Sequence, residues 1–363
     1  MTPSSQARLR RPWIVAFGCI ATGLLGRSLL GFPAAVEWHR ETLFPLVCAA
    51  LQAFFRSTIH SVGELLAMVV IGLALVALGR SPPRAVPRVL TIGGLAVFFF
   101  YATWGLAYRY PPLSDHLSAL SASGEAPEYL VSTFELSARL VAELTPKSLS
   151  SGSDLELLGR VNAALTKGFE ALPLSLEASP IRAIDFGPAR FSRVSFALTR
   201  LQLSGYYFPW TGEAHINQQM PRSAWARVAG HERAHQRGFA RENEATVMGV
   251  LACLGSSDPP VRYSGALGLF IALDRDVARG DAGARKRLWD LLPARALSDL
   301  REEEAFWKAQ EGAMARVSEK VNDTYLKAQG VRSGVVSYSE TTRLFLQALQ
   351  TGSLSASAFK DLR

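Results

Sequence analysis

Cysteine is scarce in this chain, which has only Cys19, Cys48 and Cys253 among its 363 residues. Two of the three lie inside apolar segments. So few thiols exclude both a disulfide framework and a metal site made of thiolates. The cellular compartment must therefore be inferred from membrane topology.

Charged residues are also few, at 19% of the chain against 48% hydrophobic residues. This mixture is too apolar for a disordered protein and too charged for a protein that lies wholly in lipid. The formal charge of +8 does not lead us to expect a nucleic-acid partner. Much of the arginine lies beside apolar runs near the N-terminus, where anionic lipid headgroups are the nearer partner.

Three apolar segments predict transmembrane helices, at about residues 12–31, 60–79 and 89–108. The clearest runs without a charge from Val89 to Tyr108, and a helix of that length spans about 30 Å, the thickness of a hydrocarbon core. The first segment is broken only by Arg27, whose side chain can reach the headgroups. The second has a shorter charge-free core and spans if the uncharged residues before it extend the helix.

A fourth apolar run, at about 42–55, is too short for a span and predicts an interfacial or re-entrant helix. With three spans, the N-terminal segment and the loop before the third span fall on one side of the membrane. These two pieces carry Arg8, Arg10, Arg11, Arg80, Arg84 and Arg88. The positive-inside rule places them in the cytoplasm. Residues 1–110 then form a multi-pass anchor in the cytoplasmic (inner) membrane, and residues 111–363 lie on its periplasmic side.

The segment 111–363 has the size of one soluble domain. Apolar residues at three- and four-residue spacing predict amphipathic helices over Leu117–Leu144 and Asp154–Leu172. Between about Ile184 and Ile216, aromatic and β-branched residues punctuated by glycine and proline predict a small sheet, with Phe191-Ser-Arg-Val-Ser-Phe as one of its stretches. Helical patterns return from Arg222 onward. The predicted fold is mainly α with a small β-sheet (α+β).

The segment His231-Glu-Arg-Ala-His235 carries the chemistry. In a helix that begins near Pro221 or Ser223, His231 and His235 project from one face, one turn apart. Two neutral imidazoles so placed are typical ligands of Zn²⁺, and a catalytic site adds a third protein ligand and leaves one position for water. Glu232 is then placed to act on that water as general base.

A third ligand is expected shortly after the second histidine. Gly238 can end the helix in a left-handed conformation and turn the chain sharply. Glu242 and Glu244 follow, and both are within reach of the same metal ion. We expect the outer face of the helix to be less buried than is usual in zinc peptidases, because it carries Arg233 and Arg237.

Several other polar residues have weaker interpretations. We do not expect His215 to be a metal ligand. Tyr325 and Tyr338 are candidates for stabilising an oxyanion, although a buried structural role is the commoner one for a tyrosine. The run Glu302-Glu303-Glu304 predicts a solvated helix face.

The chain resembles an uncharacterised bacterial family of membrane-anchored, zincin-like proteins catalogued as a domain of unknown function. The resemblance rests on Ser61-Val-Gly-Glu-Leu, Trp104-Gly-Leu-Ala-Tyr-Arg, Phe208-Pro-Trp-Thr-Gly-Glu-Ala-His-Ile-Asn, His231-Glu-Arg-Ala-His-Gln-Arg-Gly-Phe-Ala-Arg-Glu, Asn322-Asp-Thr-Tyr-Leu-Lys and Val336-Ser-Tyr. It implies a gluzincin-like peptidase domain on three membrane helices.

The same resemblance bears on the third ligand and on the substrate. Glu242-Asn-Glu-Ala245 resembles the E-x-x-A stretch that supplies the ligating glutamate in several HExxH peptidase families, which favours Glu242 and leaves Glu244 as the alternative. In a zincin-like arrangement Thr211 to Asn217 would be the edge strand above the metal, able to pair with an extended peptide.

These patterns favour a membrane-anchored zinc metallopeptidase that acts on a peptide or protein substrate. His231, His235 and Glu242 would bind Zn²⁺, and Glu232 would be the base. One alternative is a membrane-anchored sensor or scaffold with a structural or vestigial metal site. Another is a zinc amidase that acts on a cell-envelope substrate.

Overall fold

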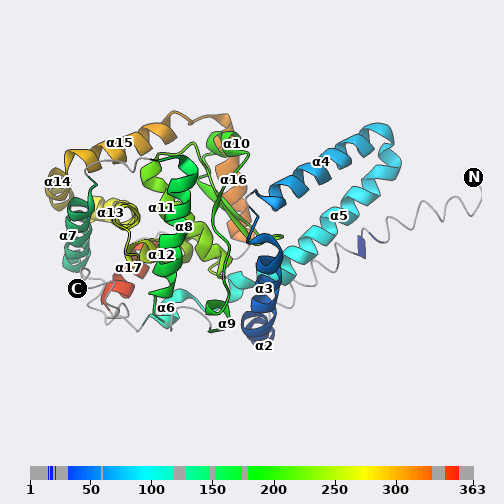
Figure 1. Ribbon diagram of the computed structural model, residues 1–363, viewed down its shortest axis with the longest axis horizontal. Helices are drawn as coiled ribbons and strands as arrows, with labels where there is room; N and C mark the ends of the chain where they lie inside the picture. The colour runs from blue at the N-terminus through cyan, green and yellow to red at the C-terminus, as the bar shows by residue number, and fades with distance from the viewer. Residues whose placement is uncertain are drawn as a thin grey trace, which may run out of the picture. The chain divides into compact units, whose positions relative to one another are not determined.

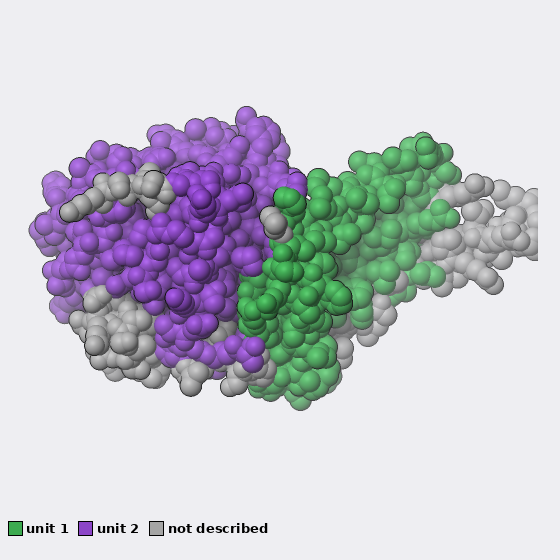
Figure 2. Space-filling model, viewed as in Figure 1, with its two compact units in different colours: residues 1–110, 184–187, 208–213 green, residues 111–183, 188–207, 214–363 purple. Residues whose placement is uncertain are grey.

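Helices form most of this structure, a computed structural model that describes residues 15, 17, 18, 21, 32–58, 60–117, 127–146, 152–173, 179–328 and 340–350. One three-stranded sheet accompanies them, so the predicted mainly α fold with a small sheet is confirmed. The chain divides into two compact units, coloured separately in Figure 2. Unit 1 comprises residues 1–110, 184–187 and 208–213, and unit 2 comprises residues 111–183, 188–207 and 214–363.

Unit 1 contains the N-terminal helices and a long helical hairpin (Figure 1). Its elements are α2 (Pro33–Trp38), the π-helix η2 (His39–Leu43), α3 (Phe44–Phe55), α4 (Val62–Arg80), α5 (Pro82–Thr103) and the 3₁₀-helix η3 (Gly105–Arg109). The run at about 42–55 is thus helical, mainly as α3. Ser61 caps α4, because its hydroxyl oxygen accepts the Glu64 N–H at 3.0 Å.

The helices α4 and α5 each hold a segment long and apolar enough to cross a membrane, Val62–Arg80 and Ala85–Thr103. They run side by side in Figure 1. Only 11% of the first segment and 17% of the second is buried in the structure. Large apolar side chains such as Leu66, Ile71 and Leu73 are exposed instead. The first predicted span, at about 12–31, lies almost wholly outside the described residues.

The third predicted span, at about 89–108, differs in its boundaries from the helix that forms. The helix α5 begins at Pro82 and ends at Thr103, after which the chain tightens into η3. Proline at the first helical positions loses no hydrogen bond, so the arginine-rich loop is helical as well. Trp104 and Tyr108 are buried in unit 1, where the Trp104 ring lies 6.3 Å from that of Phe44. Both residues fall within the predicted span, yet the structure buries them in the core of unit 1.

Unit 2 is built around a cluster of helices (Figure 1). Its helices are α6 (Leu113–His116), α7 (Pro127–Leu144), α8 (Asp154–Glu170), α9 (Ser179–Arg182), α10 (Ser195–Arg200), α11 (Arg222–Gln236), α12 (Glu242–Leu254), α13 (Pro259–Gly280), α14 (Ala282–Asp290), α15 (Ala294–Lys308), α16 (Ala313–Ala328) and α17 (Glu340–Gln350). The helix predicted over Asp154–Leu172 is α8. The one predicted over Leu117–Leu144 forms as α7 from Pro127, and residues 118–126 lie outside the described part of the chain.

The core of unit 2 is apolar and is shared by α7, α8, α11, α12 and α13. Phe134 of α7 stacks on Phe270 of α13 with 4.5 Å between ring centroids. In α12, every residue from Val247 to Leu254 is buried. Such a fully buried helix fixes its neighbours, because a close-packed interior does not tolerate sliding.

The sheet has the strand order β1-β3-β2, with β1 (Arg190–Phe191), β2 (Gly205–Phe208) and β3 (Glu213–Ile216). Strands β1 and β3 are parallel, with Arg190 opposite His215. All four residues of β3 are buried, as befits a central strand. The prediction that Thr211–Asn217 forms an edge strand is therefore wrong, and β2 is an edge. The stretch that begins at Phe191 was predicted to belong to the sheet, but helix α10 begins within it at Ser195.

Candidate metal centre

Helix α11 carries the two histidines. It begins at Arg222, directly after Pro221, as predicted. His231 and His235 lie one turn apart on the same face, with ring centroids 4.7 Å apart and ring planes at 90°. The helix ends at Gln236, and Gly238 adopts a positive φ of 93°, the left-handed conformation expected for it. The turn at Gly238 sends the chain back into α12.

Two glycines let α12 approach α11 closely. A Cβ atom added to Gly230 would lie 2.7 Å from the Gly249 carbonyl oxygen, and one added to Gly249 would lie 2.5 Å from the His231 amide nitrogen. Only hydrogen fits in these spaces. The helices therefore cross next to His231, and the first turn of α12 comes to lie beside the histidine face.

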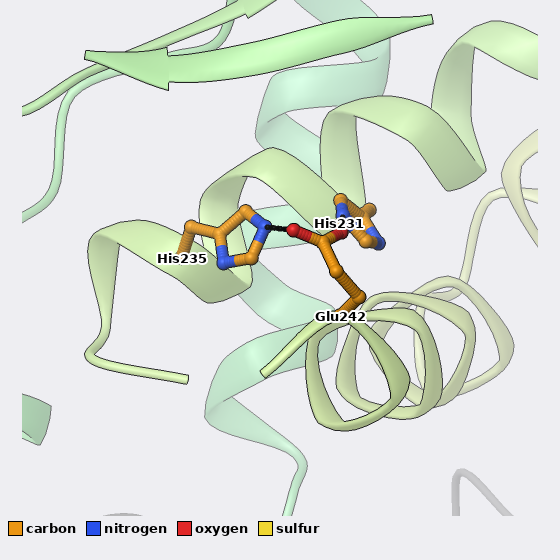
Figure 3. Close-up of side chains that lie close together, drawn as sticks. All are labelled: His231, His235 and Glu242. Atoms are coloured by element: carbon orange, nitrogen blue, oxygen red, sulfur yellow. Dashed lines mark hydrogen bonds and ion pairs between the residues drawn. The ribbon is translucent and has the colours of Figure 1, made fainter. Parts of the chain in front are cut away.

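Glu242, the first residue of α12, directs its carboxylate at both histidines (Figure 3). Its Oε2 lies 3.1 Å from Nε2 of His231, and its Oε1 lies 3.7 Å from Nε2 of His235. These ligand atoms all lie within 4.8 Å of one another. Donors of a tetrahedral zinc ion with bonds of about 2.0–2.1 Å are about 3.3 Å apart. The spacing and the two-nitrogen, one-oxygen donor set fit such an ion.

Each imidazole is held by a second hydrogen bond on its other nitrogen. Nδ1 of His235 lies 2.7 Å from the Phe239 carbonyl oxygen, which can only accept, so Nδ1 carries the proton. Nδ1 of His231 lies 3.2 Å from Oγ1 of Thr246, and that hydroxyl donates to the Glu242 carbonyl at 2.8 Å. The hydroxyl oxygen is then the acceptor for His231. In its neutral form each ring would therefore present the Nε2 lone pair that a metal requires.

Glu244, the alternative third ligand, lies elsewhere. Its carboxylate accepts the Leu113 N–H at 2.9 Å and the Arg241 guanidinium at 2.8 Å. The side chain is buried with these partners. The structure thus brings Glu242, and not Glu244, to the histidines.

Glu232 is buried, with 3% of its surface exposed. Its carboxylate lies against the edge strand, since a Cβ atom on Gly205 would meet Oε1 of Glu232 at 2.7 Å. Burial raises the pKa of Glu232 to about 7, while the charges of His231 and His235 oppose that rise. A carboxyl with such a pKa can both accept and return a proton near neutral pH.

The other two groups hold each other in their charged forms when no metal is bound. Burial alone would lower the pKa of His235, but its hydrogen bond to Glu242 and the charge of that residue raise it to about 9. Burial would likewise raise the pKa of Glu242, yet the two histidines hold it well below its ordinary value. A metal ion must therefore displace a proton from His235 when it binds.

An open pocket of about 560 Å³ adjoins the metal ligands. It is lined by Ser204, Arg227, Val228, His231, Glu242, Thr246, Val250, Gly268, Ile271, Ala272, Arg275, Glu303 and Thr341. His231 and Glu242 face it, with 21% and 49% of their side chains exposed, whereas His235 has 8%. The ligand set is therefore reachable from one side, and a small molecule fits beside it.

One expectation about charged residues is wrong, and another holds only in part. Arg233 is 1% exposed, and its guanidinium donates to the Asn162 carbonyl at 2.8 Å and to Thr166 at 3.0 Å, so the outer face of α11 is buried against α8 at this residue. Glu302 and Glu304 are exposed, as predicted, but Glu303 between them forms an ion pair with Arg227 and lines the pocket. In both cases long arginine side chains find partners that lie far away in sequence.

Three other candidates were named from the sequence, of which the structure describes the side chain of His215. His215 is fully buried in β3 and stacks on Tyr206, with 4.6 Å between ring centroids. Tyr338 and the side chain of Tyr325 lie outside the described residues. The sequence alone did not identify Thr246 or the Gly230–Gly249 pair as parts of the site. For Thr246, its position one turn after Glu242 was a usable signal.

Most of this chain, residues 39–346, matches a family model described as "Protein of unknown function (DUF3810)". The chain belongs to that family. No curated protein and no solved structure matches it.

Proposed function

We propose that this member of the DUF3810 family is a membrane-anchored, zinc-dependent hydrolase that cleaves peptide bonds. The convergence of two histidine nitrogens and the Glu242 carboxylate, with Glu232 buried next to His231, carries the proposal. Among the described residues, this is the only such group of metal-binding side chains with compatible spacing.

In this proposal His231, His235 and Glu242 hold the ion. Bound zinc would supply a Lewis acid and lower the pKa of water towards 7. Glu232 accepts the proton of the attacking water on its carboxylate and later delivers it to the leaving amine. Its pKa of about 7 suits both transfers. Thr246 and the Phe239 carbonyl keep the two imidazoles in the required tautomer.

The edge strand β2 supports a peptide substrate. It runs past Glu232 at Gly205, and it stands at the end of the strand order β1-β3-β2. An extended chain can pair with backbone groups on such an edge, which positions a scissile bond without reading its side chains. This role replaces the one expected of Thr211–Asn217.

The helices α4 and α5 serve as membrane anchors in this proposal. Many large apolar side chains of these helices are exposed, and a hydrocarbon environment would cover them. With the segment at about 12–31 as a third span, unit 2 lies outside the cytoplasmic membrane. A phosphatase reporter fused to the C-terminus should be active there, and a fluorescent cytoplasmic reporter should be dark. The reverse pattern would overturn this topology.

Metal analysis of the full-length protein in detergent tests the function. The wild type should contain about one equivalent of zinc. Glu232→Gln should retain the zinc and lose cleavage of a peptide library measured by mass spectrometry. Glu304→Gln, an exposed glutamate on α15, is the matched control and should keep both.

Each contrary outcome has its own meaning. Protein without zinc after reconstitution would end the hydrolase proposal. Zinc without cleavage of any peptide, and no effect of Glu232→Gln, would favour the sensor or scaffold. Cleavage of envelope amides but not of peptides would favour the amidase.

A further inference from the structure

The pocket beside the metal ligands has a distinctive charge pattern. Four of its lining residues are charged, namely Arg227, Glu242, Arg275 and Glu303. Arg227 and Glu303 form an ion pair with each other, and 11% and 18% of their side chains are exposed. Glu242 faces the histidines. The fourth charged residue of the lining is Arg275.

Arg275 lies on the pocket face of α13. Gly268, Ile271 and Ala272 of the same helix line the pocket too, and the three- and four-residue steps between them and Arg275 define one face. Arg275 is exposed and forms no ion pair with any other described residue. Its neighbours Asp274 and Asp276 are engaged elsewhere, with Arg285 and Thr342 respectively.

We propose that Arg275 binds a carboxylate of the substrate, so that the hydrolase selects peptides with a negative charge a fixed distance from the scissile bond. This inference rests on the proposed function. With a divalent cation held by one glutamate and two neutral histidines, the metal centre carries a net positive charge, and Arg275 adds another. A guanidinium matches the planar, bidentate partner that a carboxylate offers.

The position of the pocket agrees with this selection. Ser204, which lines the pocket, directly precedes β2, and its carbonyl accepts the Asn217 N–H at 2.8 Å. A peptide aligned on β2 would therefore lead into the pocket beside His231. Val228, Val250 and Ile271 add apolar lining there. The preferred residue would combine an apolar stem with a terminal carboxylate, either an acidic side chain or the free C-terminus.

A series of dicarboxylic acid monohydroxamates tests the inference with the zinc-loaded, full-length protein. The hydroxamate end binds zinc, and the carboxylate is carried on chains of increasing length. The partner series carries a carboxamide instead. Binding is measured by calorimetry, so no turnover is required. At one chain length the carboxylate should bind roughly two- to fivefold more tightly than the carboxamide, as expected for an ion pair with an exposed arginine.

Variants assign that preference to Arg275. Arg275→Gln should remove it while leaving the affinity for the carboxamide series unchanged. Arg279→Gln, one turn further along α13 and outside the pocket, should preserve it. Peptide pairs with Glu against Gln, and with a free against an amidated C-terminus, then distinguish the two sources of carboxylate.

The failures are separable. If neither series binds because zinc is absent, the proposed function itself fails. If both series bind equally at every length, or if Arg275→Gln keeps the preference, the hydrolase proposal stands and the role of Arg275 is wrong.

Discussion

Gly249 packs directly against the backbone of His231, so closely that a Cβ atom would lie 2.5 Å from the histidine amide nitrogen. This contact sets the distance between α11 and α12. It therefore decides whether Glu242, at the start of α12, reaches Nε2 of His231 at 3.1 Å. The glycine supports the metal centre without supplying a ligand.

Gly249→Ala should lower the zinc affinity at least tenfold and reduce the midpoint of thermal unfolding. Backbone atoms on both helices would have to move apart to admit the methyl group, and overpacking of this kind costs about 1–3 kcal/mol. Competition with a chromophoric chelator measures the affinity.

Gly159→Ala on α8 is the control, because nothing lies within 4 Å of the added atom. It should leave zinc binding unchanged and stabilise the protein by about 0.5–1 kcal/mol. Wild-type zinc affinity in Gly249→Ala would show that the helix crossing does not position Glu242.

We expect substitutions of the two glutamates of α12 to affect zinc binding and stability differently. Glu242→Gln should weaken zinc binding by more than the roughly 10- to 100-fold that follows loss of a group that only orients a ligand. Glu244→Gln should keep zinc and lose about 1–3 kcal/mol of stability, because its buried carboxylate accepts the Leu113 N–H and pairs with Arg241. Metal titration and thermal unfolding of both variants separate these effects. The opposite assignment would make Glu244 the ligand.

Thr246→Val should reduce zinc affinity by roughly 10- to 100-fold, since the hydroxyl that accepts from Nδ1 of His231 is lost. Thr246→Ser keeps the hydroxyl and should bind zinc as the wild type does. Equal affinities of the Val and Ser variants would mean that this contact does not orient the ring.

Local patterns predicted the parts of this protein that depend on local physics. The four-residue spacing of His231 and His235, the positive φ of Gly238 and the start of α11 follow from helix geometry and capping. The length and apolar composition of α4 match what a membrane-crossing helix requires. Each needs only residues close in sequence.

Features that depend on distant partners were missed. Nothing in the segment around Arg233 indicates that Asn162 and Thr166 lie opposite it. The sequence therefore predicts an exposed side chain for Arg233, whereas the structure buries it. Strand β3 is central because β1, which is distant in sequence, lies on its other side. Nothing in the sequence of β3 itself indicates that neighbour. Glu303 and Arg227 are likewise far apart in sequence and were not paired.

Arg233→Met should lower the free energy of unfolding by about 2–3 kcal/mol, because the buried Asn162 carbonyl and Thr166 hydroxyl lose a charged donor. Arg237→Met should cost less, because that guanidinium mainly covers the Phe169 ring, 4.0 Å away. Chemical denaturation compares the two, and equal losses would contradict the distinction.

The carboxylate of Glu213 caps the first membrane-length helix within unit 1. It accepts the N–H groups of Val62 at 3.0 Å and of Gly63 at 2.7 Å, and the Thr211 hydroxyl donates to it at 2.6 Å. These N–H groups belong to the first turn of α4, where no intrahelical partner exists and a negative charge is favoured. Glu213→Gln removes the charge and should cost about 1–3 kcal/mol, seen as a lower unfolding midpoint in detergent.

Two further variants make that experiment decisive. Gly63→Ala should be at least as harmful, because its Cβ atom would lie 2.5 Å from the Phe208 ring and 2.8 Å from the Glu213 carboxylate. Glu41→Gln, whose side chain is 40% exposed and forms an ion pair with Arg40 in unit 1, should change the midpoint little. If Glu213→Gln were as stable as Glu41→Gln, the N-terminus of α4 would have to be satisfied without this carboxylate. The Ser61 cap of Glu64 alone would then suffice to hold the helix start in place.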